Sequence, residues 1–508
     1  MSDANLLKKD TRNDRMTQTR TATRRFGLSK SKITAFEQCP KKLWLATHRP
    51  ELAEQDEGAE ARFATGNAVG EIACALHPGG VMVDSPSLSE ALAKTSALVS
   101  GGHPGPIFEA TFEHNGVLVR VDVLEKVEGG GWAAAEVKSS GKVKDYHRGD
   151  LATQVWVMRE AGIELKRAAI RHIDTGFALT REGDYAGLFT DTDLLAELEG
   201  TIAARPALVA EARATLSGEE PQREMGDHCS APFACEFAAY CTRDLPQGPE
   251  WPVTVLPHGG GKRWLERGVE DLLDLAEADL NDRHARILAA TRDGIPFHDA
   301  EGARKAMAGW GWPRAWLDFE TVAPAVPRWV GTRPYQQIPF QFSLHLERRG
   351  GRMTHHEFLS CDGTDPRRAC AEALVEHIPA GATIIAYNAA FERSVLRDLA
   401  ASFPDLAPRL EAMAEATVDL LPVARNHWYH RDQRGSWSIK AVLPTIAAEL
   451  DYGALEVKDG GDAQAAWFEA ANPACDPLRR EALEEALKAY CARDTWAMIA
   501  VARALAGS

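Results

Sequence analysis

Long apolar runs are missing from this sequence. No stretch reaches about 18 consecutive apolar residues, the length that a helix needs to cross a bilayer. The first 25 residues also lack the apolar segment of a secretory signal. We therefore expect a cytoplasmic protein with no membrane partner. Residues 1–25 are polar and mostly basic, which predicts a disordered tail.

Positive charge is also scarce, because the formal net charge is −15. This negative net charge argues against electrostatic binding of nucleic acid over the whole surface of the protein. It leaves room for a local basic channel beside an acidic metal site. Some of the carboxylates are candidate metal ligands, whereas most keep the surface soluble.

Cysteine occurs nine times, an odd number, in a chain without an apparent export signal. Structural disulfides are therefore not expected. Four of the nine cysteines, named below, look like metal ligands. They do not have the short paired C-x-x-C spacing of a zinc ribbon. No flavin or nicotinamide fingerprint is visible either, which disfavours an iron–sulfur redox protein. The remaining cysteines are expected to be ordinary thiols: Cys74, Cys361, Cys370, Cys475 and Cys491.

The length of 508 residues predicts two or three domains, and no short internal repeat is present. Residues 26–242 mix strand and helix patterns. The segment LPQGPEWPVTVLP, with four prolines, then indicates a linker that continues into a helical hairpin, so that 243–310 connects two domains. Residues 311–508 alternate β-prone runs with amphipathic helices, which predicts a second α/β domain.

Asp122, Glu136 and Lys138 form the first candidate site. They stand in the β-prone runs VRVDVL and AAEVKSS, which a glycine turn separates. Residues two apart in a strand share a face, so Glu136 and Lys138 project together and Asp122 can join them from the adjacent strand. Two carboxylates can hold Mg²⁺, which polarises a phosphodiester, while the lysine orients the attacking water. Gln154, on the following helix, is expected to contact substrate or to position the lysine; a surface hairpin with an ion pair is the plainer alternative.

An Asp, a turn, a Glu-x-Lys and a helix with Gln, in this order, resemble the PD-(D/E)XK nucleases and specifically their RecB-like exonuclease branch. The resemblance covers residues 28–242 and implies a nuclease that uses Mg²⁺ or Mn²⁺. In that branch a helix with the pattern G-x-x-x-H often supplies a metal-binding histidine. Gly70 occupies the histidine position here, within TGNAVGE. Glu71 is then either a substitute ligand or a solvated helix residue.

Four cysteines form a candidate cluster: Cys39 in FEQCPKKLW, and Cys229, Cys235 and Cys241, spaced six apart in HCSAPFACEFAAYC. Four thiolates can ligate a [4Fe–4S] cluster or one zinc ion, with His228 as an alternative zinc ligand. One early and three late cysteines around a nuclease core resemble the iron–sulfur form of the RecB-like family, which includes CRISPR adaptation nucleases and AddB-type helicase–nucleases. The resemblance implies a structural cluster that staples the two ends of the domain together.

The second candidate site comprises Asp318 and Glu320 in WLDFETV, Glu392 in AYNAAFERSVL, and Tyr490 and Asp494 in AYCARDTW. The first two share one face of a predicted strand, and the last two, at i and i+4, share one face of a helix. Converging carboxylates can bind two metal ions about 4 Å apart, one to activate water and one to steady the leaving oxygen. Tyr490 is expected to orient the attacking water.

This order resembles the DnaQ-like, ribonuclease H-fold 3′–5′ exonucleases in their tyrosine variant, over residues 312–505. Glu392 departs from the family pattern, which usually has Asp there. Asp419, in VDLLPVARNH, is expected to be structural. In RGSWSIKAVLP, Ser436, Ser438 and Lys440 are candidate phosphate contacts, although a capped helix start is the plainer interpretation.

The whole layout resembles an uncharacterised bacterial family that joins a RecB-like nuclease to a ribonuclease H-like domain. The expected fold class is α/β, with a restriction-endonuclease-like domain and a ribonuclease H-like domain joined by a small helical region. We expect a metal-dependent nuclease that acts on nucleic acid, with DNA ends or single strands as substrate. The alternative is a nucleic-acid-binding protein with one active nuclease domain and a second that serves as a non-catalytic clamp.

Overall fold

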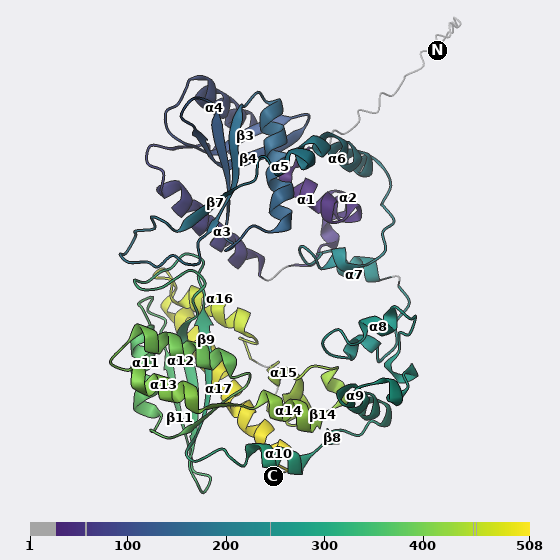
Figure 1. Cartoon of the computed structure of the whole chain (residues 1–508), viewed down its shortest axis with the longest axis vertical. Coiled ribbons are helices and arrows are strands. Elements are labelled where there is room, and N and C mark those ends of the chain that lie inside the picture. The colour runs from purple at the N-terminus through teal and green to yellow at the C-terminus, as the bar shows by residue number, and fades with distance from the viewer. Residues whose placement is uncertain (1–26, 56–57, 244, 451, 454, 508) are drawn as a thin grey trace, which may run out of the picture.

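The chain folds into two lobes, each built on its own β-sheet, as Figure 1 shows for the computed structural model. The structure describes residues 27–55, 58–243, 245–450, 452–453 and 455–507. The predicted disordered tail, residues 1–25, lies outside these residues. Helices and strands alternate in both lobes, which confirms the predicted α/β class.

The first lobe contains, in chain order, β1 (Leu28–Ser29), α1 (Lys30–Gln38), α2 (Pro40–His48), α3 (Ala59–Ala75), β2 (Val81–Met82), α4 (Leu88–Ser100), β3 (Ile107–His114), β4 (Val117–Lys126), β5 (Trp132–Lys138), α5 (Asp145–Glu160), β6 (Leu165–Ile173), β7 (Phe189–Asp193), α6 (Glu199–Ser217) and α7 (Ala238–Thr242). Its sheet has the order β2-β3-β4-β5-β6-β7, with β1 paired to β4. β3, β4 and β5 are antiparallel neighbours, and β6 lies parallel to β5 after the crossover helix α5. The predicted hairpin and the helix that follows it are therefore confirmed.

Helix α5 forms the centre of the first core, because nearly its whole middle is buried. Its residues Leu151, Ala152, Val155 and Val157 are fully buried against the sheet. The polar side chains of Thr153 and Gln154 are equally inaccessible. A buried amide must find hydrogen-bond partners, and for Gln154 these partners lie at the candidate site described below.

The connector after the first lobe differs from the predicted helical hairpin. It contains α8 (Lys262–Leu265), α9 (Asp282–Asp293), β8 (Phe297–His298) and α10 (Ala300–Met307). Between α8 and α9 the chain forms only 3₁₀ turns, because Gly268 has a φ of 76° and the side chain of Asp271 caps the first turn. Trp251, Val253 and Trp264 of the connector share one hydrophobic core with the second lobe.

The second lobe contains β9 (Arg314–Val322), β10 (Ile338–Glu347), β11 (Met353–Leu359), α11 (Arg367–His377), β12 (Thr383–Ala386), α12 (Ala390–Ser402), α13 (Ala407–Ala416), β13 (Thr417–Asp419), α14 (Leu421–His427), β14 (Trp428–Tyr429), α15 (Ile439–Val442), α16 (Gly460–Ala470) and α17 (Pro477–Leu505). Its sheet order is β11-β10-β9-β12-β13. The first three strands are antiparallel, and β12 and β13 continue parallel to β9. The central strand β9 and the long helix α17 are in contact, which sets the place of the second site.

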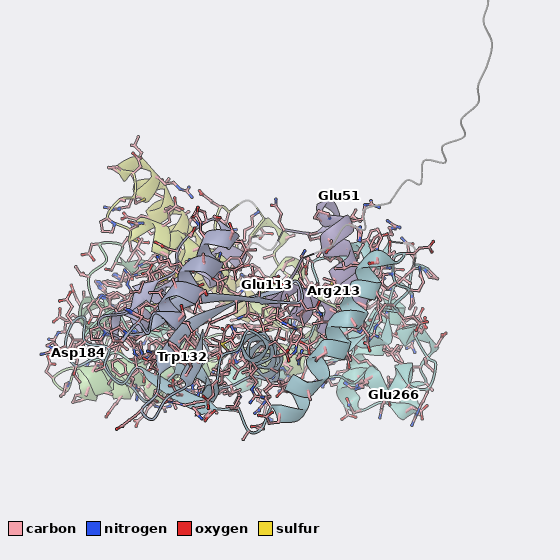
Figure 2. All side chains as sticks on the ribbon, turned by 90° about the horizontal axis from the view of Figure 1, so that it is seen from above. Glu51, Glu113, Trp132, Asp184, Arg213 and Glu266 are labelled. Atoms are coloured by element: carbon pink, nitrogen blue, oxygen red, sulfur yellow. The ribbon has the colours of Figure 1, made fainter. Side chains whose placement is uncertain are left out.

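The lobes also touch through loops that are distant from the connector. The backbone of Leu179 exchanges hydrogen bonds with Gly331 and Thr332, at 2.7 and 3.0 Å. The hydroxyl of Tyr185 donates to the carbonyl of Pro327 at 3.1 Å. In the view of Figure 2, Asp184 of this contact and Glu266 of the connector lie at opposite sides of the molecule. The two lobes are therefore held together at two separate places. Within the described part of the chain, no helix is both long and apolar enough to span a bilayer.

Candidate functional site

The structure brings Asp122, Glu136 and Lys138 together, as the hairpin pattern predicted. The Oδ2 atom of Asp122 accepts a hydrogen bond from the backbone N–H of Val137 at 2.6 Å, which binds β4 to β5. Nζ of Lys138 lies 2.9 Å from Oε1 of Glu136. Gln154 donates through Nε2 to Oε2 of Glu136 at 2.5 Å and to the carbonyl of Arg120 at 2.9 Å. Gln154 thus positions the glutamate rather than the lysine.

Further ionic groups at this first site were not predicted from the sequence. Lys30, the first residue of α1, forms an ion pair with Oε1 of Glu136. Asp150 accepts from Lys138 at 3.1 Å and from the hydroxyl of Thr34 at 2.7 Å. Glu109 of β3 lies opposite Asp122 of β4, because the residues on either side of each are paired across the two strands. The φ angle of Glu109 is 55°. Only Asp150 left a signal in the sequence, since a carboxylate four residues before Gln154 shares its helix face.

The two predicted carboxyl groups of the first site have pKa values shifted in opposite directions. Burial and the charge of Glu136 raise the pKa of Asp122 to about 8. Burial would also raise the pKa of Glu136, but Lys30 and Lys138 outweigh it and hold that pKa below its usual range. A glutamate neutralised by two ammonium groups has less need of a metal ion than an unpaired one.

Gly70, which the resemblance places at the histidine position, lies on α3. A Cβ carbon added at Gly70 would meet no atom within 4 Å outside the backbone of its own helix. Glu71 is exposed. Among the described residues, the first site contains no group of three ligand atoms within 4.8 Å of one another. Asp122 and Glu136 therefore do not belong to a group of three ligand atoms as close as that of the second site described below.

All four predicted cluster cysteines line one cavity, together with His228 and Phe237. The cavity has an empty volume of about 340 Å³, including the part that opens to solvent. Cys39 is the N-cap residue directly before α2, while Cys229, Cys235 and Cys241 come from the segment that ends the lobe. The side chain of Gln38 fixes the two segments to each other, because Nε2 donates to the carbonyls of His228 and Phe233 at 2.9 and 2.7 Å.

The four sulfurs do not form a compact group in this structure. Four thiolates around one zinc ion, each about 2.3 Å from the metal, must lie within about 4 Å of each other. No three of the sulfurs, all of them in described residues, lie within 4.8 Å of one another. In a four-iron cluster each thiolate binds its own iron, so the sulfurs stand farther apart. As they are placed in this structure, the four thiols do not surround a single ion at bonding distance.

The carboxylates of the second site converge closely. Asp318 and Glu320 come from the middle of β9, and Asp494 from α17. One oxygen of each lies within 4.8 Å of the others. The strand supplies two carboxylates on one face, and the helix packs across this face of the sheet. Three oxygen ligands at this spacing can hold a hard divalent cation such as Mg²⁺ or Mn²⁺.

Glu392, at the start of α12, lies beside this triad without belonging to its tight group. Its negative charge raises the pKa of Asp318 and of Glu320 after burial and the nearer carboxylates. The Oε2 atom of Glu392 is buried and, within the described residues, has no hydrogen-bond partner. A buried unpaired carboxylate is costly, and a cation at the triad would offset part of this cost.

Asp419 has the structural role that the sequence suggested. Its Oδ1 atom accepts from the backbone N–H groups of Asn388 and Leu421, at 3.0 and 2.9 Å. These bonds fix the turn before α12, where Asn388 has a φ of 70°. Asp419 therefore supports the placement of Glu392.

Two tyrosines and a lysine complete the second site. Both Tyr452 and Tyr490 donate hydrogen bonds to Asp494, the former at 2.5 Å to Oδ1. Lys440 places Nζ 5.2 Å from the ring centre of Tyr490, and its charge lowers the pKa of Asp494 and Glu320. Tyr490 was predicted for this site, whereas Lys440 was proposed only as a phosphate contact. Tyr452 stands in a segment without a clear pattern and was missed.

Mutual repulsion within the triad shifts its protonation. Burial and Asp494 raise the pKa of Glu320 to about 8, and burial raises the pKa of Asp494 to about 6 in spite of Tyr452 and Lys440. Burial and the charges of Asp494 and Glu320 raise the pKa of Asp318 well above its usual range. A divalent cation would supply the missing positive charge, so the donor set fits a metal ion.

We expect the stability of the metal-free protein to fall as the pH rises from about 4 to about 8. The folded triad keeps protons in this range that the unfolded chain has already released, so unfolding is favoured by each increase in pH. The rise in melting temperature on adding Mn²⁺ should therefore be larger at pH 8 than at pH 5. Melting curves in EDTA and in Mn²⁺ at both values of pH test this. An equal or smaller rise at pH 8 would contradict it.

Comparison with known proteins gives one local match. A family described as a domain of unknown function (DUF2779) matches residues 315–438, about a quarter of the chain. The match includes β9 with Asp318 and Glu320, and also Glu392, but ends before Tyr490 and Asp494. No curated protein and no solved structure matches the chain.

Proposed function

We propose that this protein is a metal-dependent nuclease whose hydrolytic centre is the triad of Asp318, Glu320 and Asp494. The observation that carries the proposal is the convergence of the three carboxylate oxygens within 4.8 Å, with raised pKa values that call for a cation. Carboxylates that hold one or two divalent ions against a phosphodiester are a general solution for its hydrolysis. DNA ends or single strands are the expected substrate.

The strand order of the second lobe supports this proposal. An antiparallel set of three strands, extended by two strands parallel to the first, is the arrangement expected of a ribonuclease H-like fold. In this arrangement the first strand, here β9, carries the leading pair of acidic residues, and a late helix, here α17, carries the last. The first lobe has a helix, three antiparallel strands, a crossover helix and a parallel strand, which suits a PD-(D/E)XK domain.

The residues of the second centre have separate tasks. Asp318, Glu320 and Asp494 would hold a divalent ion, which would polarise the phosphate as a Lewis acid and make a bound water more acidic. Tyr490 directs its hydroxyl toward Asp494 and orients the attacking water beside it. Lys440, a few ångströms away from Tyr490, stabilises negative charge on the phosphate. Glu392 adds negative charge that favours retention of the cation.

The experiment is a cleavage assay with labelled single- and double-stranded DNA and RNA, in Mg²⁺, in Mn²⁺ and in EDTA. We expect cleavage in either metal and none in EDTA. Absence of cleavage for all four polymers in both metals would refute the nuclease function. The pattern of products, mononucleotides or internal fragments, identifies an exonuclease or an endonuclease.

The second candidate function is that of a nuclease with one active domain, in which the first lobe is a nucleic-acid clamp. The pairing of Glu136 with both Lys30 and Lys138, and the absent ligand at Gly70, favour it. In that case Asp122→Asn should leave the cleavage rate within about twofold of wild type. If both lobes cut, Asp122→Asn should remove one component of the activity, seen as a changed preference among the four polymers.

Tyrosine 490 offers a further prediction with a matched control. Tyr490→Phe should lower the rate of cleavage by about tenfold to a hundredfold, the range for loss of one well-placed polar group in catalysis. Tyr452→Phe removes the other hydrogen bond to Asp494, and because Tyr452 is not assigned to the attacking water we expect a smaller effect on kcat. Equal losses in the two variants would show that Tyr490 acts only by holding Asp494. Rates at saturating metal and substrate are the measurement.

A further inference from the structure

A second large pocket lies on the connector, outside both acidic sites. It has an empty volume of about 810 Å³, including open solvent. One wall comes from residues 254–259, Gly261, Lys262 and Leu265, and the other from Arg434, Gly435 and Ser436. The pocket therefore joins the connector to a loop of the second lobe that leads toward the carboxylate triad.

Two glycines allow these walls to approach each other. A side-chain carbon at Gly435 would stand 1.7 Å from the carbonyl oxygen of Val255, and one at Gly261 would stand 2.2 Å from that of Val253. Gly435 also has a φ of 78°. Backbone contacts of this kind leave no room for any other residue. The pocket is thus built by close packing of the chain and is not a loose gap between loops.

The charge of the pocket is opposite to that of the protein as a whole. Its lining includes Lys262, Arg434 and His258, and none of its described lining residues is acidic. The net charge of the chain is −15. Lys262 is exposed, and within the described part of the chain its ammonium makes no hydrogen bond or ion pair. Arg434 is held in place over the ring of Trp251, 4.9 Å from its centre, and donates to the carbonyl of Glu250 at 3.1 Å.

Basic groups next to the pocket strengthen its positive field. Gly260 packs against the ring of His284, so this histidine lies directly behind the glycine loop. Burial and the charges of Arg263 and Arg283 lower the pKa of His284. Arg263 and Arg283 thus add positive charge beside the pocket, and positive charge attracts anions.

The pocket and the carboxylate triad are linked by one short segment. Ser436 lines the pocket, and four residues later Lys440 lies beside Tyr490. Four residues span at most about 14 Å. Trp437 anchors the segment between them, because it is buried and its carbonyl accepts from the hydroxyl of Tyr387 at 2.7 Å. Helix α15, which carries Lys440, contacts α17, and Figure 1 shows it between α17 and the connector with α8.

We propose that this pocket binds the phosphate backbone of a single-stranded nucleic acid whose end lies at the triad. Lys262 and Arg434 neutralise backbone phosphates. The hydroxyl of Ser436, which donates to Oγ of Ser438 at 3.3 Å, turns to donate to one of them, and Lys440 contacts the phosphate nearest the triad. The proposal rests on the nuclease function of the second lobe and adds the path by which the strand reaches it. A backbone contact of this kind carries no base preference.

The test is equilibrium binding of a labelled single-stranded oligonucleotide in EDTA, where no cleavage occurs. Lys262→Ala and Arg434→Gln should each weaken binding by about fivefold, and the double variant more. The slope of log K against log salt should become shallower by about 0.7 for each charge removed. Lys262→Ala is the decisive variant, because the glutamine at 434 also changes the contact with Trp251; melting curves check the fold of both.

Lys305→Ala and Arg349→Ala are the matched controls, since both residues are exposed and lie outside the pocket. They should bind like wild type. Failure of the wild type to bind the oligonucleotide, or binding by Lys262→Ala that equals wild type, would overturn the proposal. An acidic polypeptide of equal length is tested with the same variants. If the substitutions weaken its binding while the oligonucleotide binds as it does to wild type, the pocket binds a protein partner and the proposal is wrong. The nuclease function is tested separately by cleavage in Mn²⁺, so its failure cannot be confused with failure of the pocket.

Discussion

Asp318→Asn is expected to abolish metal-dependent cleavage, with a loss of at least about a thousandfold. Asparagine keeps the shape and one oxygen of the side chain but removes the charge. Asp318 is central to the triad, because its pKa is raised by Asp494, Glu320 and Glu392 in addition to burial. A cation bound there would lose one of its three close carboxylate ligands. Rates in Mg²⁺ and Mn²⁺ over a wide range of metal concentration separate weaker metal binding from slower chemistry.

The same substitution should stabilise the metal-free protein. Removing one of three repelling carboxylates relieves the penalty that raises their pKa values, so the melting temperature in EDTA at pH 8 should rise. Glu485→Gln, an exposed change on the same helix as Asp494, is the control for both measurements and should alter neither. Lost cleavage together with a lower melting temperature in EDTA would indicate a damaged fold and would argue against a charged metal site.

Much of the second site could be predicted because its residues occupy regular elements. Asp318 and Glu320 are two apart in a strand, and Tyr490 and Asp494 are four apart in a helix. Each spacing fixes a common face without knowledge of the tertiary structure. The convergence of strand and helix follows from packing of α17 on the sheet, which the sequence indicates only through its apolar periodicity.

Residues that reach a site through irregular segments could not be predicted. Tyr452 lies between 3₁₀ turns and α16, and its bond to Asp494 crosses 42 positions of the sequence. Lys30 meets Glu136 across 106 positions, at the first turn of α1. No local pattern encodes such contacts. They arise because the core brings the ends of several elements to one point.

The connector shows how a helical pattern can mislead. Apolar residues recur at helical spacing through GVEDLLDLAEADL, yet the structure has short turns there. Asp271 binds the backbone N–H of Leu273, which starts a turn in place of continuing a helix. Leu272 and Leu275 are buried in the core shared with the second lobe. Burial of these residues against a neighbouring surface outweighed local propensity.

Cys235→Ser is expected to remove a brown colour from the purified protein and to destabilise the first lobe. A cluster that joins Cys39 to Cys229, 190 positions later, closes a loop whose entropy in the unfolded chain is large. By the relation used for covalent cross-links, such a closure contributes up to about 5 kcal/mol. Hydrogen bonds from Gln38 and the ion pair of Lys42 with Glu236 remain in the variant. We therefore expect a loss of about 3 kcal/mol, which lowers the melting temperature by roughly 6–12 °C.

The matched control is Cys475→Ser, which removes a half-buried thiol from the second lobe and should change neither colour nor stability of the first. Absorption near 400 nm is not sufficient alone, so iron, sulfide and zinc are measured on the same samples. About four irons per wild-type chain, and loss of iron in Cys235→Ser, would support the predicted iron–sulfur cluster. A colourless wild type with one zinc would instead require the four thiolates to move closer together than they stand here. A wild type that contains neither iron nor zinc and that is only as stable as Cys235→Ser would contradict the prediction. The cysteines would then not hold the two ends of the lobe together.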